Sequence, residues 1–160
     1  ALPASAEGSV VYAKDGTSAG SSLIGIAPVA TGADPYFHTR PSTSVTDGTA
    51  VSGGSNKGTF NQDLLDTINQ RRQQIAAREG VSESAVPPDA VTASASGLDP
   101  DISPAYAALQ VPRVARVTGL PVDRVQELVA HATDGRILGF LGEPTVNVTE
   151  LNLAVADERP

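Results

Sequence analysis

The sequence predicts a single α+β domain in which the N-terminal half forms a small mixed sheet and three to four helices make up the rest. Three observations lead to this prediction. The chain has 160 residues, the size of one ordinary domain. Its first half is rich in Gly, Ser and Thr around short apolar runs, which is typical of strands and turns. Its second half repeats apolar residues at spacings of three, four and seven, which is typical of amphipathic helices.

Two short strands are expected near the N-terminus. The runs 8–12 and 22–26 are bounded by turn residues, and Asp15-Gly16 lies between them. We therefore expect two strands that are joined by a turn or loop. Residues 27–60 hold few apolar side chains and much Gly, Ser, Thr and Pro. A long irregular stretch of this kind in a compact domain is usually functional or mobile.

The first helix is expected to span residues 62–79. Asn61 is suited to the N-cap, because its side chain can accept a hydrogen bond from a free first-turn N–H. Gly80 is suited to a left-handed stop. One face of this helix is apolar and consists of Leu64, Leu65, Ile68, Ile75 and Ala76.

A second helix is expected to begin at Ser103-Pro104, with the serine as cap and the proline at the first helical position. Pro112 lacks a backbone N–H, so we expect a kink or break there, with helix resuming to about Thr118 and ending at Gly119.

Two further helices are expected near the C-terminus. One follows Pro121, with valines and a leucine on one face. Asn147 and Glu150 have the spacing of a capping box, which predicts a strand that ends at 146–147 and a last helix over 148–156. A strand through the whole of this segment is the alternative.

Composition excludes several classes of function. The formal net charge is −7 and the aromatic residues number three Tyr and three Phe, which disfavours binding to nucleic acid. The absence of Cys removes disulfides, thiolate metal sites and cysteine nucleophiles. Two histidines are too few for a metal cluster built on imidazoles. No apolar run approaches the ~20 residues that a membrane span needs.

Enzyme signatures are also missing from the sequence. Neither the dinucleotide-binding nor the nucleophile-elbow glycine pattern occurs. The segment 53–59 looks superficially like a phosphate-binding loop, yet Lys57 precedes Gly58, whereas a P-loop requires Gly-Lys-Ser/Thr. We therefore assign no catalytic residue and no metal ligand.

Three loop segments combine residues that are common at binding sites. The segment 36–42 joins aromatic side chains to His and Arg, which suits an interface or the edge of a ligand site. The segment 50–56 could form an anion-binding nest, and 92–100 leads into a helix N-terminus that could hold an anion. Composition alone favours a structural role for each segment. The segment 36–42 would be a loop held by two core aromatics, 50–56 a flexible loop, and 92–100 a helix-entry turn.

In this order along the chain, these segments resemble the C subunit of the Kdp potassium-transporting P-type ATPase. The resemblance spans about residues 8–156. Each matching string is weak alone, but all of them occur in register. They are Gly20-Ser21-Ser22-Leu23-Ile24-Gly25, the segment 36–42, Ser52-Gly53-Gly54-Ser55-Asn56, the segment 91–100, Ile102-Ser103-Pro104, residues 110–115, Leu141-Gly142-Glu143-Pro144, Val146-Asn147-Val148 and residues 150–154.

The resemblance implies an accessory subunit that performs no catalysis itself. Its partners would be the channel-like potassium-binding subunit and the ATP-hydrolysing subunit, whose affinity for ATP it would raise as a catalytic chaperone. The family begins with one membrane-spanning helix, so residues 1–7 would be the stub after that anchor. Residues 8–156 would be the soluble domain and 157–160 a tail. No cofactor would be required by the chain, and ATP could be bound through a site shared with the pump subunit.

Two mechanisms remain open under this resemblance. In one, the domain lies on the extracytoplasmic side of the cell membrane and docks onto its partners through two loops. The partner-interface candidates are Tyr36, Phe37, His38, Arg40, Pro41, Ser42, Ser52, Gly53, Gly54, Ser55 and Asn56. In the other, it takes part in binding ATP as a regulatory module. The nucleotide candidates are Ser94, Ser96, Gly97, Gln110 and Arg113. The acidic composition favours the first, because a triphosphate prefers basic surroundings.

Overall fold

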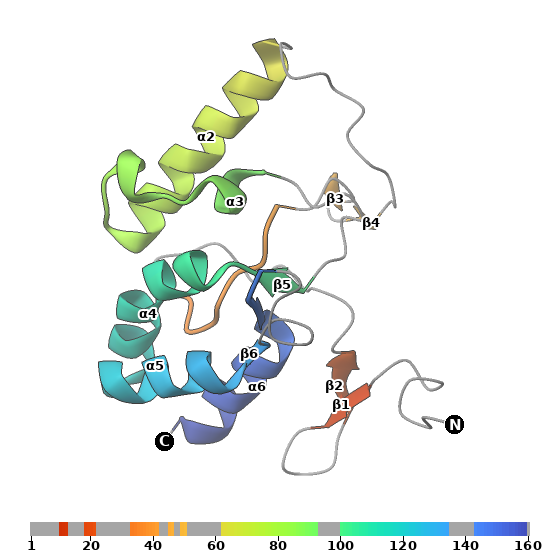
Figure 1. Cartoon of the computed structure of the whole chain (residues 1–160), viewed down its shortest axis with the longest axis vertical. Coiled ribbons are helices and arrows are strands. Elements are labelled where there is room, and N and C mark those ends of the chain that lie inside the picture. Colours follow the sequence, from red (N-terminus) through yellow and green to blue (C-terminus); the bar gives the residue numbers. More distant parts are fainter. Residues whose placement is uncertain are drawn as a thin grey trace.

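The computed structural model describes residues 10–12, 18–21, 33–41, 45–46, 49–50, 62–92, 100–134 and 143–159. These ranges contain both helices and short antiparallel strands, which confirms the predicted α+β class (Figure 1). The helices are α2 (Gln62–Glu79), α3 (Pro88–Val91), α4 (Pro104–Thr118), α5 (Val122–His131) and α6 (Val148–Glu158), with a 3₁₀ turn over Glu83–Ala85. The strands are β1 (Val10–Tyr12), β2 (Ser18–Ser21), β3 (Val45–Thr46), β4 (Thr49–Ala50), β5 (Asp101–Ile102), β6 (Thr133–Asp134) and β7 (Thr145–Asn147).

The expected helix boundaries are confirmed where the structure describes them. Helix α2 covers the predicted residues and ends at Gly80, whose φ is +70°. Helix α4 begins at Ser103, whose hydroxyl accepts a 3.0 Å hydrogen bond from the backbone N–H of Tyr106. It ends at Gly119 with φ +78°. The Asn61 cap predicted for α2 lies outside the described residues.

The break expected at Pro112 does not occur, because α4 is one continuous helix from Pro104 to Thr118. A proline removes the hydrogen bond to the carbonyl four residues earlier, which here belongs to Ala108. Both Pro112 and Ala108 lie on the exposed side of α4. Water can therefore reach that carbonyl, while the buried side of the helix keeps its packing.

The C-terminal helix is confirmed, and the alternative of a continuous strand is not. Strand β7 ends at Asn147, and the side-chain oxygen of Asn147 accepts a 3.1 Å hydrogen bond from the backbone N–H of Glu150. This is the N-cap that the spacing predicted. Helix α6 then runs to Glu158, slightly beyond the predicted end.

The position of the main sheet differs from the prediction. Strands β5, β7 and β6 form a three-stranded antiparallel sheet in that order, and all three come from the C-terminal half. The described strands of the N-terminal half form two separate antiparallel pairs, β1 with β2 and β3 with β4. Strand β2 covers 18–21, and the predicted strand at 22–26 lies outside the described residues. The C-terminal strands are too short to show an alternating pattern in the sequence.

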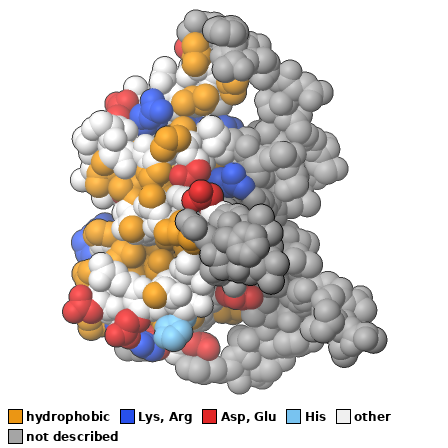
Figure 2. Space-filling view, viewed as in Figure 1, with side chains coloured by type: hydrophobic (Ala, Val, Ile, Leu, Met, Phe, Trp, Pro, Cys, Tyr) orange, Lys and Arg blue, Asp and Glu red, His pale blue; other side chains and the backbone are white. Residues whose placement is uncertain are grey.

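The hydrophobic core lies between α4, α5, α6 and the three-stranded sheet, with α2 and α3 packed on one side (Figure 1). Val114, Val125, Val146, Leu151 and Val155 are fully buried in it. On the face shown in Figure 2, side chains of both charges are interspersed among apolar ones, with no broad patch of either sign over the described residues. No helix in the described ranges is both long and apolar enough to cross a membrane.

Candidate functional site

Residues 33–41, which we call the strap, form an irregular segment that is nevertheless largely enclosed. Phe37 is 0% exposed, and Asp34 and His38 are 6% and 5% exposed. Buried backbone without helix or strand partners must find hydrogen bonds elsewhere. In the strap, side chains of α4 and α6 provide them.

Two amide side chains hold the centre of the strap by paired hydrogen bonds. Gln110 of α4 accepts a 2.7 Å bond from the N–H of His38 and donates a 3.1 Å bond to its carbonyl. Asn152 of α6 accepts a 2.7 Å bond from the N–H of Phe37 and donates a 3.0 Å bond to its carbonyl. Each amide therefore satisfies both polar backbone groups of one buried residue, as a neighbouring strand would.

Arg113 joins the strap to the end of α2. Its guanidinium is 1% exposed and donates to the carbonyls of Asp34 and of Tyr36, the latter at 2.9 Å. It also donates to Gln110 at 3.0 Å and forms a 2.9 Å ion pair with Glu79. A buried charge is tolerated only when it is paired and hydrogen-bonded, and this guanidinium meets both conditions.

A second arginine extends this buried cluster toward α4. Arg78 contacts Glu79 at 2.5 Å and donates a 3.0 Å hydrogen bond to the phenolic oxygen of Tyr106. Tyr106 is 1% exposed, and burial raises the pKa of its phenol. Glu79 thus faces two guanidiniums, which fixes the C-terminal end of α2 against α4.

His38 lies inside the cluster as a neutral imidazole. Burial, together with the positive charges of Arg78 and Arg113, lowers the pKa of His38 to about 3. The Asp34 carboxylate is 3.2 Å from Nε2 of His38 and acts in the opposite direction, but it does not outweigh the other effects. The side chain is enclosed, so solvent hardly reaches the imidazole in this conformation.

The predicted site residues fall into three groups in the structure. One group comes together in the buried cluster. It joins the interface candidates Phe37 and His38 to the nucleotide candidates Gln110 and Arg113. Tyr36, Arg40 and Pro41 are half-buried at the surface of the strap. The others lie outside the described residues: Ser42, Ser52, Gly53, Gly54, Ser55, Asn56, Ser94, Ser96 and Gly97.

The sequence interpretation missed five members of the cluster, namely Asp34, Arg78, Glu79, Tyr106 and Asn152. Asn152 had a detectable signal, because it follows the buried Leu151 and lies between Val148 and Val155 of the same helix. A polar amide beside the apolar face of a helix usually has a buried partner. Glu79 resembled an ordinary charged residue at a helix end, and its partner lies 34 residues away in the chain.

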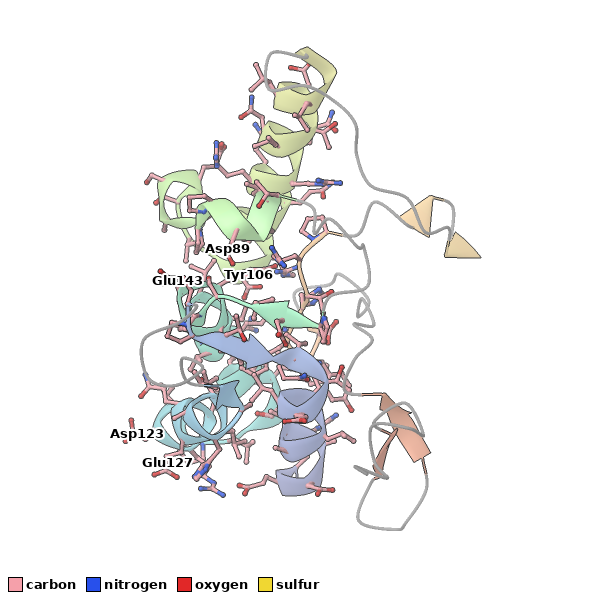
Figure 3. All side chains as sticks on the ribbon, turned by 45° about the vertical axis from the view of Figure 1, so that its right-hand side comes forward. Asp89, Tyr106, Asp123, Glu127 and Glu143 are labelled. Carbon is pink, nitrogen blue, oxygen red and sulfur yellow. The ribbon has the colours of Figure 1, made fainter. Side chains whose placement is uncertain are left out.

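A pocket of about 640 Å³ lies at the end of the strap, beside the N-terminus of α4. It is lined by Arg40, Asp89, Asp101, Ile102, Ser103, Pro104, Glu143, Pro144 and Thr145. Asp89 accepts a 3.2 Å hydrogen bond from the N–H of Ser103, and Asp101 accepts a 3.4 Å bond from the Thr145 hydroxyl. Figure 3 shows Asp89 and Glu143 on one part of the molecule, away from Asp123 and Glu127 on α5.

Among the described residues, no three His, Asp or Glu side chains are grouped so that they could hold a metal ion. The pocket carboxylates do not converge on one point, and two of them are engaged in the hydrogen bonds just described.

Comparison with known proteins gives a consistent result. Residues 1–157 match the family model described as KdpC: K⁺-transporting ATPase, c chain. The chain is 50% identical over 161 residues to the potassium-transporting ATPase KdpC subunit of Kineococcus radiotolerans, with 99% of this chain and 80% of that protein covered. It is 49% identical to the subunit of the same name from Variovorax paradoxus, with 96% and 79% covered. It is 47% identical to the subunit of the same name from Polaromonas naphthalenivorans, with 99% of this chain and 80% of that protein covered.

Proposed function

The chain belongs to the KdpC family, the c chain of the K⁺-transporting ATPase, and on this premise we propose that it is a non-catalytic accessory subunit of that potassium uptake complex. It assembles with the channel-like potassium-binding subunit and the ATP-hydrolysing subunit and stabilises both. It acts as a chaperone of catalysis by raising the affinity of the hydrolysing subunit for ATP.

The engagement of the buried polar groups carries this proposal. Arg113, Gln110 and Glu79 bond to one another or to the strap backbone, and none of them faces solvent. Groups that bind and turn over a substrate need access to it. The cluster instead fixes the strap over residues 34–38, and the half-buried Arg40 and Pro41 follow shortly after in the chain. A rigidly held surface segment suits docking, because less conformational entropy is lost on binding.

The surface that docks is proposed to include the strap end and the 52–56 loop. Tyr36 and Arg40 supply an aromatic ring and a guanidinium, which are frequent at protein interfaces, and Pro41 restricts the backbone beside them. Arg159 lies over the Tyr36 ring, with its guanidinium carbon 5.9 Å from the ring centroid. The C-terminal end of α6 therefore supports the same surface.

We place this domain on the extracytoplasmic side of the cell membrane. A transport complex is associated with a membrane, and the family resemblance implies an N-terminal anchor. Cys is absent from the chain and the net charge is −7, which suit an exported domain that is not built around a nucleotide.

A shared ATP site with the pump subunit receives less support from the described residues. Gln110 and Arg113 are 0% and 1% exposed and are occupied by the strap. At the N-terminus of α4, where an anion is favoured by the helix dipole, Asp89 already accepts the N–H of Ser103. A phosphate there would meet the negative charge of this carboxylate.

Reconstitution tests the proposed function. The other subunits of the potassium-transporting ATPase are purified without this chain, and ATP hydrolysis is measured against ATP concentration before and after the full-length subunit is added. We expect the subunit to bind the complex and to lower the KM for ATP, while it hydrolyses no ATP by itself. Failure to bind, or an unchanged KM in the bound complex, would contradict the proposal. Isothermal titration of the subunit alone with ATP separates direct binding from an effect on the partner.

A further inference from the structure

The pocket at the end of the strap lies at the surface, with the exposed Pro104 and Glu143 among its lining residues. We propose that it receives a Lys or Arg side chain from another subunit of the potassium-transporting complex. This inference rests on the proposed docking function and gives it a specific contact.

The walls of the pocket suit the stem of a long basic side chain. Pro104 and Pro144 line it with accessible aliphatic surface, and Ile102 also borders it. Lys and Arg carry three or four methylene groups, which they bury along apolar surface while the charged head reaches polar partners. Ile102 is 1% exposed and belongs to the core, so this part of the wall is firmly held.

The charges around the pocket select a cation over an anion. Among the lining residues that the structure describes, the carboxylates of Asp89, Asp101 and Glu143 stand against one guanidinium, that of Arg40, which leaves a formal excess of two negative charges in this set. Asp89 and Asp101 are fixed by hydrogen bonds to Ser103 and Thr145. A basic head group would therefore meet carboxylates already in position, which lowers the entropic cost of binding it.

The size of the pocket favours a side chain over a small ion. A volume of about 640 Å³ is far larger than the roughly 30 Å³ that one water molecule occupies. A potassium ion held there would remain largely hydrated and would gain little from the aliphatic walls. A Lys or Arg side chain uses the apolar walls and the carboxylates together.

Charge reversal at the pocket tests the inference. Glu143 is exposed, so Glu143→Lys changes the pocket charge without opening the core. Asp123→Lys on α5 makes the same change of charge at an exposed position away from the pocket (Figure 3). Binding of each full-length variant to the remaining subunits of the complex is measured at several salt concentrations.

We expect Glu143→Lys to weaken binding about tenfold or more and to flatten its dependence on salt, because truncated or reversed charge pairs at interfaces lose affinity of this order. Glu143→Gln should lie between this variant and the wild type, and Asp123→Lys should bind within about twofold of the wild type. Thermal unfolding of each variant checks that the fold is retained.

The outcomes separate this inference from the proposed function. Wild-type protein that fails to bind the complex contradicts the proposed function. Wild-type protein that binds, with Glu143→Lys binding equally well, overturns only the inference about the pocket. Titration of the chain alone with potassium chloride and with spermidine completes the test: tight binding of either that Glu143→Lys abolishes would assign the pocket to a small cation and overturn the inference as well.

Discussion

Gln110 and His38 are 72 residues apart in the chain, and the side-chain amide of Gln110 hydrogen-bonds both the backbone N–H and the backbone carbonyl of His38. The relationship explains how an irregular segment can be buried in the domain. It also removes Gln110 from the surface, where a nucleotide or a partner could reach it. The first predictions concern this way of holding the strap.

Replacement of Gln110 by Ala should destabilise the protein by about 2–4 kcal/mol, because it leaves two buried backbone groups of His38 without partners and opens a cavity. Chemical denaturation measures this free energy of unfolding. Gln126→Ala on the exposed side of α5 is the matched control and should change stability by no more than about 0.5 kcal/mol. Equal effects of the two substitutions would show that the strap is not held by Gln110.

Loss of Arg113 should be among the most damaging single changes. Arg113→Ala leaves the carboxylate of Glu79 with fewer partners in the interior, and breaking a buried pair in this way costs about 3–5 kcal/mol. Arg113→Lys should recover little, because an ammonium cannot bond Asp34, Tyr36, Gln110 and Glu79 from one planar group.

The control for Arg113 is Arg124, which is 41% exposed and pairs with Glu127 and Glu158. Arg124→Ala should cost far less stability than Arg113→Ala, since solvent screens exposed pairs. Both unfolding free energies come from the same denaturation experiment. A larger loss for Arg124 than for Arg113 would contradict the assignment of Arg113 as the central residue of the cluster.

Stability should fall on acidification because of His38. The unfolded chain binds a proton on this imidazole near its ordinary pKa of 6.5, whereas the folded chain does so only near pH 3. Between these two values the unfolded state binds more protons, so the contribution of His38 to stability falls by about 1.4 kcal/mol per pH unit as pH decreases. Above pH 6.5 this contribution is complete and constant.

Comparison with a variant isolates this effect from the titration of carboxylates. The unfolding free energy of the wild type minus that of His38→Asn should decrease between pH 6.5 and pH 4, in the window where the unfolded His38 gains its proton. His131→Asn, at an exposed position at the end of α5, is measured in parallel. A pH-independent difference for His38→Asn would show that the buried imidazole is not kept neutral by the fold.

Asn152 should control the exposure of the strap without direct contact with its surface end. Asn152→Ala removes both hydrogen bonds to Phe37 and should increase amide hydrogen exchange across residues 34–38. Binding to the remaining subunits should weaken at the same time if the strap end docks onto them. Asn69→Ala on the exposed side of α2 provides the control for both measurements. Unchanged exchange in Asn152→Ala would argue against α6 as an anchor of the strap.

Replacement of Pro112 by Ala should stabilise α4. Alanine restores the N–H that can bond the exposed carbonyl of Ala108, and it is a far better residue than proline within a helix. Greater freedom of the unfolded chain offsets part of the gain, so we expect a net increase of about 1 kcal/mol, seen as a higher Tm. Pro104→Ala, at the first helical position, should give no such increase. A lower Tm for Pro112→Ala would indicate that the proline shapes the helix.

The sequence by itself determined the local elements whose causes are local. The caps at Ser103 and Asn147 and the left-handed glycines at 80 and 119 act within one helical turn, so their spacing in the chain was sufficient. The apolar periodicity likewise predicted the long helices and the α+β class. The very short strands β5, β6 and β7 were not predicted as a sheet, because two or three residues carry no period.

Only the tertiary structure decided the roles of the polar residues. Gln110 and Arg113 had been grouped with Ser94, Ser96 and Gly97 as nucleotide candidates, and Phe37 and His38 with a partner interface, yet the fold joins these four in one buried cluster. A side chain's chemistry shows what it can bond, and its partner depends on which distant segments packing brings within about 3 Å. The charged pocket formed by the strap end, α3, β5 and the segment before β7 arises in the same way, because its walls come from parts of the chain that only folding brings together.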